Sequence, residues 1–358
     1  MHSGGVRFLH ATLPPLAGLA VALILGGCAS APPADPLPYR IEVQDAGLGE
    51  SFRGASFGVG GRMWSSGTSG TVLHRGGPRE GWSQAQLPSA GDRDLRDIDV
   101  RLDGQVFAMA AGTGPDSALY RSEGAVGNWQ QVLANPDAEG FFDSLAFDSA
   151  GVGLLVGDPL RGSFTFFRSR DGQSWQRLER ARCPTAAEGE YAFAASGSIL
   201  LATAPNEFWF ATGGSASHIW HTESAGDVWF DTSAPEVGGG PSQGWFGLGH
   251  DGRGTLIAVG GDYAAPQQSS TFAVLREGTA SWETGTLPGF RSAVQAVPGR
   301  PGYWVAVGSH GADWSADGGS SWQPLEIPGG HALAPAGPSA VLVVGGPEQP
   351  HRIVRFLD

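Results

Sequence analysis

The sequence predicts an all-β protein and, more narrowly, a seven-bladed β-propeller. Three observations support this prediction. Short apolar runs that end in a glycine recur seven times along the chain, and tryptophans recur between them. The composition agrees, because glycine is abundant at 57 residues and charged residues make up only 16%. Such a mixture suits many short strands joined by tight turns.

Each apolar run has the length of a buried strand and is too short for a stable isolated helix. The seven runs end at Gly67, Gly112, Gly157, Gly213, Gly260, Gly308 and Gly345, and the tryptophans are Trp82, Trp129, Trp175, Trp229, Trp282 and Trp322. The last repeat therefore lacks an outer strand. We expect Tyr39–Val43 to supply it, so that an N-terminal strand completes the last blade, closes the ring and leaves no exposed sheet edge.

The N-terminal segment predicts export and lipid anchoring. Residues 1–27 have the pattern of a lipoprotein signal peptide, with Arg7 before an apolar run and Leu25-Gly26-Gly27-Cys28 as the lipobox. We expect Cys28 to carry the lipid, residues 28–38 to form a Pro/Ala tether, and residues 39–358 to form the propeller. Ala29 after the cysteine favours the outer membrane, facing the periplasm, over the inner membrane. The alternative is an ordinary secretory signal in which Cys28 is incidental.

Charge and composition exclude several function classes. The formal net charge of −13 argues against a nucleic-acid partner. All 22 basic residues are arginines, which excludes Schiff-base lysine chemistry and the lysine of phosphate-binding loops. We expect no cofactor and no metal, because the sequence has neither a dinucleotide-binding motif nor metal-ligand spacing. Cys183 has no disulfide partner once Cys28 is lipidated, and we expect a monomer that contacts the membrane only through that lipid.

The turn before the tryptophans carries a second repeated motif, the Asp-box, which is complete at Ser315-Ala316-Asp317-Gly318-Gly319-Ser320-Ser321-Trp322. We expect the aspartate to accept backbone N–H bonds and the tryptophan to pack between blades. Together with Ser51–Gly54, Phe141–Phe147, Gly157-Asp158-Pro159 and Val259–Tyr263, this motif resembles the BNR/Asp-box propellers similar to photosystem II stability/assembly factors. The resemblance implies a non-catalytic protein that docks on, or helps assemble, another protein. The lipobox and the eroded Asp-boxes of blades one, two and five depart from that family.

Aligning the repeats predicts which side chains meet at the channel mouth. Each blade contributes the residue at the start of its innermost strand, namely Arg53, Arg96, Asp143, Phe193, Phe246, Arg291 and His331. The neighbouring loops add Asp158, Asp262 and Tyr263. Around the ring, Arg291, His331, Arg53 and Arg96 would form one cationic arc. These arginines either recognise an anionic group or pair with carboxylates of other blades, as Arg53 with Asp358 or Arg96 with Asp143 would do.

Two function classes follow from this mouth. In the first, the mouth binds a partner protein or an envelope component and no residue does chemistry. In the second, the protein is a sialidase-like glycoside hydrolase that acts on an anionic sugar, with Tyr263 as nucleophile, Glu190 as its base, and Asp143 or Asp158 as acid. The catalytic phrases of such enzymes are absent, which favours the binding hypothesis, while the question of an enzyme stays open.

Overall fold

The computed structural model describes residues 37–44, 49–77, 80–87, 89–122 and 128–358. The predicted signal peptide, Cys28 and nearly all of the 28–38 tether lie outside these residues. The prediction of an all-β chain is confirmed, because the described residues contain no α-helix. Their helical turns are three short 3-10 turns, η1 (Val59–Gly61), η2 (Gly114–Asp116) and η3 (Arg180–Arg182).

The described strands form seven antiparallel sheets. Three sheets follow the chain order from the first apolar repeat: β2 (Phe52–Phe57), β3 (Met63–Gly67), β4 (Thr71–Arg75) and β5 (Ser83–Gln86); β6 (Asp94–Val100), β7 (Val106–Ala111), β8 (Ala118–Ser122) and β9 (Trp129–Ala134); β10 (Phe142–Phe147), β11 (Gly153–Leu160), β12 (Ser163–Ser169) and β13 (Gln176–Arg177).

The next three sheets include one of six strands, which the sequence did not predict. They are β15 (Leu200–Ala204), β16 (Glu207–Ala211), β18 (Ile219–Thr222) and β19 (Phe230–Asp231); β14 (Glu190–Tyr191), β17 (Gly213–Gly214), β20 (Gln243–His250), β21 (Thr255–Asp262), β22 (Ser270–Arg276) and β23 (Glu283–Leu287); β24 (Ala293–Ala296), β25 (Trp304–Gly308), β26 (Gly311–Ser315) and β27 (Gln323–Pro324). The extra pair, β14 and β17, attaches to β20 because Gly213 pairs with Gly244.

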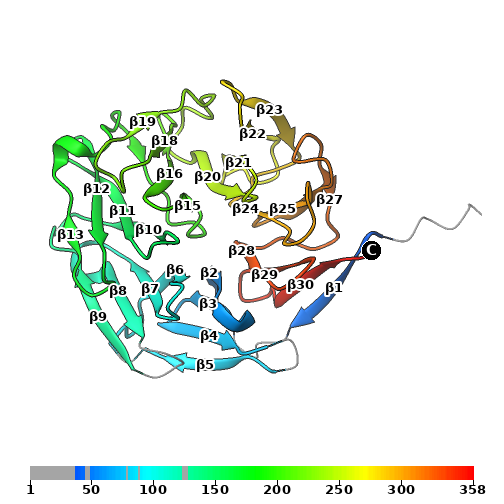
Figure 1. Cartoon of the computed structure of the whole chain (residues 1–358), viewed down its shortest axis with the longest axis horizontal. Helices are drawn as coiled ribbons and strands as arrows, with labels where there is room; N and C mark the ends of the chain where they lie inside the picture. Colours follow the sequence, from blue (N-terminus) through cyan, green and yellow to red (C-terminus); the bar gives the residue numbers. More distant parts are fainter. Residues whose placement is uncertain (1–36, 45–48, 78–79, 88, 123–127) are drawn as a thin grey trace, which may run out of the picture. The chain divides into compact units, whose positions relative to one another are not determined.

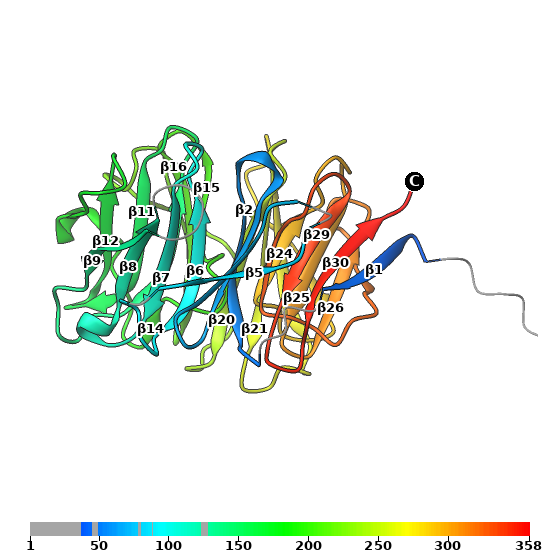
Figure 2. The ribbon, with the colours of Figure 1, turned by 90° about the horizontal axis from the view of Figure 1, so that it is seen from below.

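The seventh sheet joins the two ends of the described chain. It contains β28 (Ala332–Pro335), β29 (Ala340–Val344), β30 (His351–Phe356) and β1 (Tyr39–Gln44), and β1 pairs antiparallel with β30 along its whole length. Figures 1 and 2 show these two strands side by side. The segment expected to supply the outer strand of the last repeat is therefore β1.

Within the compact unit Pro38–Asp358, the sheets follow one another around a common centre, with one strand of each innermost (Figure 1). Each innermost strand contacts the next, in the order β2, β6, β10, β15, β20, β24 and β28, and β28 contacts β2. Apolar side chains fill the space between sheets, as where Phe164 and Phe166 of β12 meet Phe210 of β16 with ring centroids 4.9 and 5.4 Å apart. Burying each such ring contributes about 1.5–3 kcal/mol.

Five of the seven glycines that end the apolar repeats are required by the close approach of a backbone carbonyl, whereas Gly112 and Gly345 have side-chain atoms of Asp116 and Gln349 nearest. A Cβ atom on Gly308 would lie 2.0 Å from the carbonyl oxygen of Phe290, and one on Gly260 would lie 2.0 Å from that of Gly244. Both carbonyls belong to the segment that enters the centre of the molecule. The repeated glycines therefore allow the innermost segments to approach their neighbouring strands.

The turn between β26 and β27 contains the complete Asp-box sequence. Asp317 Oδ1 accepts the backbone N–H of Ser321 at 2.9 Å, and Trp322 Nε1 donates to the carbonyl of Gly319 at 3.1 Å. The half-buried Trp322 ring meets Phe272 of the preceding sheet edge-on, with centroids 5.9 Å apart. These contacts hold the turn and link two neighbouring sheets.

Candidate functional site

Four innermost strands contain a β-bulge at the residue that the repeat alignment placed at the mouth. The pairing register shifts between Phe52 and Gly54, Leu95 and Asp97, Phe142 and Ser144, and Trp245 and Gly247. The residues left out of the ladder are Arg53, Arg96, Asp143 and Phe246. A bulge redirects the side chain of its extra residue. These four side chains therefore do not follow the regular alternation between the two faces of their sheets.

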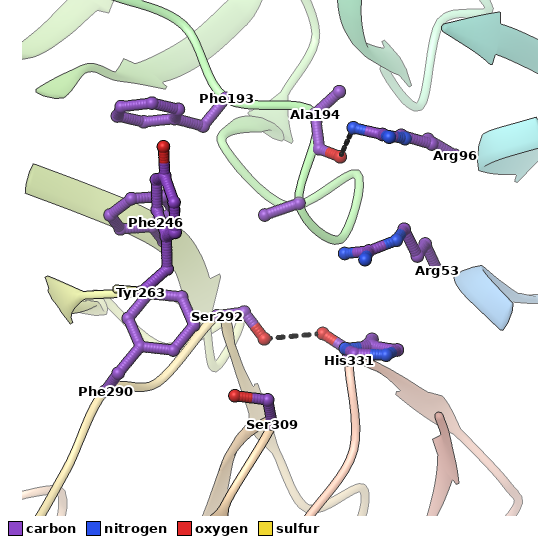
Figure 3. Close-up of a pocket in the computed structure, with 11 residues that line it drawn as sticks. Arg53, Arg96, Phe193, Ala194, Phe246, Tyr263, Phe290, Ser292, Ser309 and His331 are labelled. Atoms are coloured by element: carbon purple, nitrogen blue, oxygen red, sulfur yellow. Dashed lines mark hydrogen bonds between the residues drawn. The ribbon is translucent and has the colours of Figure 1, made fainter. Parts of the chain in front are cut away.

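Three of the bulge residues line one pocket of about 430 Å³ at the centre of the molecule, called here the mouth pocket. Its lining residues are Arg53, Arg96, Phe193, Ala194, Ala195, Phe246, Tyr263, Phe290, Ser292, Ser309 and His331. Figure 3 shows that the pocket has two unlike sides, with the aromatic rings on one side and the two arginines on the other. The alignment missed Ala194, Ala195, Phe290, Ser292 and Ser309.

The aromatic side is a packed cluster. Phe193 stacks on Phe246 with ring centroids 4.4 Å apart, and Tyr263 meets their edges at 6.0 and 5.9 Å. Phe290 packs edge-on against Phe246 at 4.9 Å. Tyr263 is 50% exposed, so the cluster presents apolar surface to a ligand together with a phenolic hydroxyl group.

On the cationic side, the two arginines differ in their bonding. Arg96 Nε lies 2.7 Å from Asp94 Oδ2, and Arg96 Nη1 donates to the carbonyl of Ala194 at 3.5 Å. Arg53 is half-buried and makes no hydrogen bond or ion pair within the described residues. Burial, and then the neighbouring Arg96, lower the pKa of Arg53, while Asp94 opposes them. A half-buried guanidinium without a partner favours an incoming anion, which would supply the missing bonds.

His331 adds no positive charge at neutral pH. Burial, followed by the charges of Arg53 and Arg96, lowers its pKa to about 4, against a smaller opposing effect of Asp94. Its backbone carbonyl accepts the hydroxyl of Ser292 at 2.8 Å (Figure 3). The neutral imidazole is available as a hydrogen-bonding group, and the charge of the mouth pocket comes from Arg53 and Arg96.

The expected cationic arc requires a correction at Arg291. Arg291 is 3% exposed, and its guanidinium lies 2.5 Å from Oδ2 of Asp313 in β26, which is 1% exposed. The two side chains form a buried ion pair, and Arg291 does not line the pocket. A Cβ atom on Gly308 would meet the carbonyl oxygen of Phe290, as one on Gly67 would meet that of Ser51, so Arg291 corresponds to Phe52 and not to Arg53. Ser292, which lines the pocket, corresponds to Arg53. Of the two hypotheses for the arginines, pairing with a carboxylate therefore holds for Arg291. Its partner, Asp313, belongs to the same sheet and not to another blade.

The two specific pairs suggested by the sequence do not form. Asp358 pairs with Arg300 at 2.7 Å, and Arg96 pairs with Asp94 in its own strand. Asp143, Asp158 and Asp262 do not line the mouth pocket. Asp262 instead accepts bonds from the side chain of Gln243 at 3.2 Å and the backbone N–H of Ala264 at 2.8 Å.

The residues of the hydrolase hypothesis are not brought into a catalytic arrangement. Glu190 is 1% exposed and its carboxylate is occupied by the hydroxyl of Thr212, by His218 Nδ1 at 2.8 Å and by the N–H of Ala187 at 2.9 Å. Burial acts to raise its pKa, but these bonds lower it overall. The hydroxyl of Tyr263 makes no hydrogen bond within the described residues, to Glu190 or to any other group.

Within the described residues, the remaining reactive groups do not form a second candidate catalytic site. Burial raises the pKa of the Cys183 thiol to about 11, which disfavours the thiolate needed for nucleophilic attack. In the described ranges, no three His, Cys, Asp or Glu side chains gather in a geometry that could hold a metal ion. Nor does any helix in these ranges have the length and apolarity to cross a membrane.

The arrangement of the sheets belongs to the class of β-propeller folds, and comparison with known proteins agrees. No protein-family model and no curated protein matches the sequence. Among solved structures, the chain is similar to YCF48 bound to D1 peptide, with a TM-score of 0.56 and 15% identity over 92% of this chain and 100% of that one. It is also similar to YCF48 from Cyanidioschyzon merolae, with a TM-score of 0.59 and 14% identity over 88% and 98% of the two chains.

An enzyme has the same fold. A virginiamycin B lyase from Staphylococcus aureus has a TM-score of 0.63 and 12% identity, covering 89% of this chain and all 100% of the lyase. At these identities the likeness concerns the fold alone. A fold shared by a peptide-bound protein and a lyase leaves the function to be argued from the site.

Proposed function

We propose that this chain is a non-catalytic β-propeller, anchored in the cell envelope, whose mouth pocket binds a partner protein or envelope component through an anionic group. One observation supports this most directly: Arg53 points a guanidinium without a partner among the described residues into a pocket whose opposite side is aromatic (Figure 3). A ligand that suits both sides carries a carboxylate or phosphate next to a flat or branched apolar group. The guanidinium fork matches such anions in a bidentate geometry.

The proposal includes a seven-bladed ring closed by β1. Its support is the number of described sheets, the contact between β28 and β2, and the pairing of β1 with β30. A ring with no open edge would present a rigid mouth, and a rigid site loses less conformational freedom on binding.

For the partner we favour a protein segment. One structural neighbour, YCF48, was solved bound to D1 peptide, so a propeller of similar fold holds a peptide. A peptide can supply an acidic side chain or terminus together with an apolar side chain, as the two-sided pocket requires. A monomer that binds one segment per mouth is the simplest arrangement.

The envelope location rests on the sequence. We propose that residues 1–27 are removed as a signal peptide, that Cys28 is lipidated, that residues 28–38 act as a tether, and that residues 39–358 face the periplasm from the outer membrane. The Pro/Ala composition of the tether would keep the propeller at a distance from the lipid surface.

Site-specific photo-crosslinking in cells tests the binding proposal. A photoreactive phenylalanine analogue at Tyr263, on the rim of the pocket, should capture the partner, and Arg53→Ala should abolish that product. The matched control is the same analogue at Leu102, which is 67% exposed in the β6–β7 turn outside the pocket. Equal capture from both positions, or capture insensitive to Arg53→Ala, would contradict the proposal.

The glycoside hydrolase hypothesis has less support, since Glu190 is fully engaged elsewhere. It is tested by assaying the purified protein on a 4-methylumbelliferyl sialoside. Turnover that disappears in Tyr263→Phe would replace the binding proposal with the enzymatic one.

A further inference from the structure

The wall segment, residues 192–194, places Phe193 in the mouth pocket without belonging to any strand. Its backbone is held instead by side chains of neighbouring sheets. Asp158 of β11 accepts the backbone N–H of Ala192 at 3.1 Å. The backbone N–H of Ala194, the residue on the other side of Phe193, faces the carboxyl group of Asp143 in β10 and acts to lower its pKa. Two carboxyl groups therefore hold the peptide groups that flank one aromatic ring of the pocket.

Arg96 completes this arrangement from a third strand. Its guanidinium donates to the carbonyl of Ala194 (Figure 3). It is also paired with Asp94. The side chain that carries charge into the pocket is thereby connected to the segment that carries Phe193. Any displacement of the wall segment would alter the aromatic and the cationic side together.

The two carboxyl groups are unusual in their surroundings. Asp143 is 1% exposed, and its Oδ2 atom has no hydrogen-bond partner among the described residues. Burial, and then the nearby Asp158 carboxylate, raise the pKa of Asp143 well above its usual range, against the opposing charge of Arg96. Burial raises the pKa of Asp158 to about 6. A buried and a half-buried carboxylate so close together resist simultaneous ionisation, so the pair retains a proton that isolated carboxyl groups would lose.

We propose that Asp143 and Asp158 are positioning residues that act as a proton-operated latch on the wall segment, making ligand binding at the mouth depend on pH. With one proton on the pair, both carboxyl groups can stay close together and hold Ala192 and Ala194. When that proton leaves, repulsion between the two carboxylates separates them, and the wall segment loosens. The pocket is therefore assembled in mildly acidic conditions and loosened in alkaline ones.

Few other groups can produce a pH response in this place. Asp143 faces Asp158 of β11 and Arg96 of β6, and Arg96 is itself paired with Asp94. His331, across the pocket, has a pKa of about 4 and does not titrate near neutrality. Two candidates remain. His218 is bonded to Glu190, two residues before the wall segment, and this bond raises its pKa. Asp97 of β6 is 4% exposed and accepts the backbone N–H of Leu145 in β10 at 2.7 Å, and burial raises its pKa well above its usual range, so Asp97→Asn should also retain the transition described below. His218→Gln is therefore a required control.

The first test needs no ligand. Backbone amide and aspartate side-chain carboxyl NMR signals are followed from pH 5 to pH 8 in the protein and in Asp158→Asn, which keeps a carbonyl acceptor but cannot lose a proton. The Ala192 and Ala194 amides should shift with one midpoint, shared by the carboxyl signal of Asp143, and Asp158→Asn should remove that transition. Asp103→Asn, at the exposed β6–β7 turn, and His218→Gln should both retain it. Flat amide signals, a transition that survives in Asp158→Asn, or one lost in a control would overturn the latch.

The second test rests on the proposed function. Affinity for the crosslinked partner segment should fall between pH 5 and pH 8, by at most about tenfold per pH unit for one proton, and Asp158→Asn should flatten the profile. If the amide transition is present and the chain binds nothing at any pH, the binding proposal fails and the latch stands. If the segment binds with the same pH profile in Asp158→Asn, the latch is refuted and the binding proposal stands.

Discussion

The repeat alignment gave Arg291 and Arg53 the same position, but their different surroundings in the structure predict opposite outcomes of the same substitution. Arg291→Ala removes the partner of Asp313, whose carboxylate is 1% exposed and has Arg291 Nε at 2.6 Å. Leaving one member of a buried ion pair alone costs about 3–5 kcal/mol. Many domains have only about 5–15 kcal/mol of stability, so this loss is a large share of the total.

Arg53→Ala removes no bond within the described residues. The free energy of unfolding should therefore change by about 0.5 kcal/mol or less. If Arg53 binds an anionic group, the lost charge-assisted bond should weaken ligand binding by about 1.5–3 kcal/mol, or roughly 10- to 150-fold. The stability effect and the binding effect are thus assigned to different arginines.

Urea denaturation followed by circular dichroism, with partner affinity measured alongside, separates the two effects. The double variant Arg291→Met with Asp313→Leu is the control for charge burial, and it should recover most of the stability lost in Arg291→Ala because neither charge remains. The reasoning is refuted if Arg291→Ala unfolds at the same urea concentration as the parent. It is equally refuted if Arg53→Ala destabilises the protein as much as Arg291→Ala does.

Four further predictions concern stability and maturation. His351 is buried, and burial lowers its pKa to about 4 from an ordinary 6.5. As the pH falls from 6.5 to 4, the unfolded chain therefore binds a proton at this residue and the folded chain does not. The free energy of unfolding should fall by about 3 kcal/mol over that range. His351→Leu should remove that part of the acid destabilisation in denaturation curves measured at several pH values. Trp322→Ala should cost about 2 kcal/mol, less than a fully buried ring, and a thermal melt matching the parent would contradict the packing described for it. Deleting residues 39–44 should expose the edge of β30 and cause aggregation with a lower melting temperature; a soluble truncation that melts like the parent would show that this pairing matters little. Radiolabelled palmitate should label the protein, and labelling that persists in Cys28→Ala would disprove lipidation at that residue.

Much of the fold could be predicted because its determinants are local and repeated. Each apolar run buries one strand, and in five of the seven repeats the glycine at its end is required by the approach of a carbonyl, as at Gly260 and Gly308. The extra strands β14 and β17 could not be predicted in this way. They are two residues long each, and their pairing depends on Gly213 meeting Gly244 from another repeat.

At the site, the alignment placed five of its seven aligned residues in the pocket lining and misplaced Asp143 and Arg291. A bulge adds one residue to a strand and so reverses the side-chain alternation beyond it. In the sixth repeat the alignment was displaced by one residue, because Arg291 corresponds to Phe52, and Ser292, which lines the pocket, corresponds to the bulge residue Arg53. Repeat alignment reads residue types, whereas the bulge is a property of backbone pairing.

The bulges at Arg53, Arg96 and Phe246 have a consequence for how such a molecule can change. Their residues have no cross-strand partner in the ladder, so exchanging them alters what the pocket presents while the hydrogen bonds of the sheets stay in place. An exchange at one bulge leaves the strand pairing of the other sheets unchanged. A lineage could therefore acquire a new ligand one substitution at a time, and a designer could rewrite the specificity of the same scaffold without first re-establishing its folding.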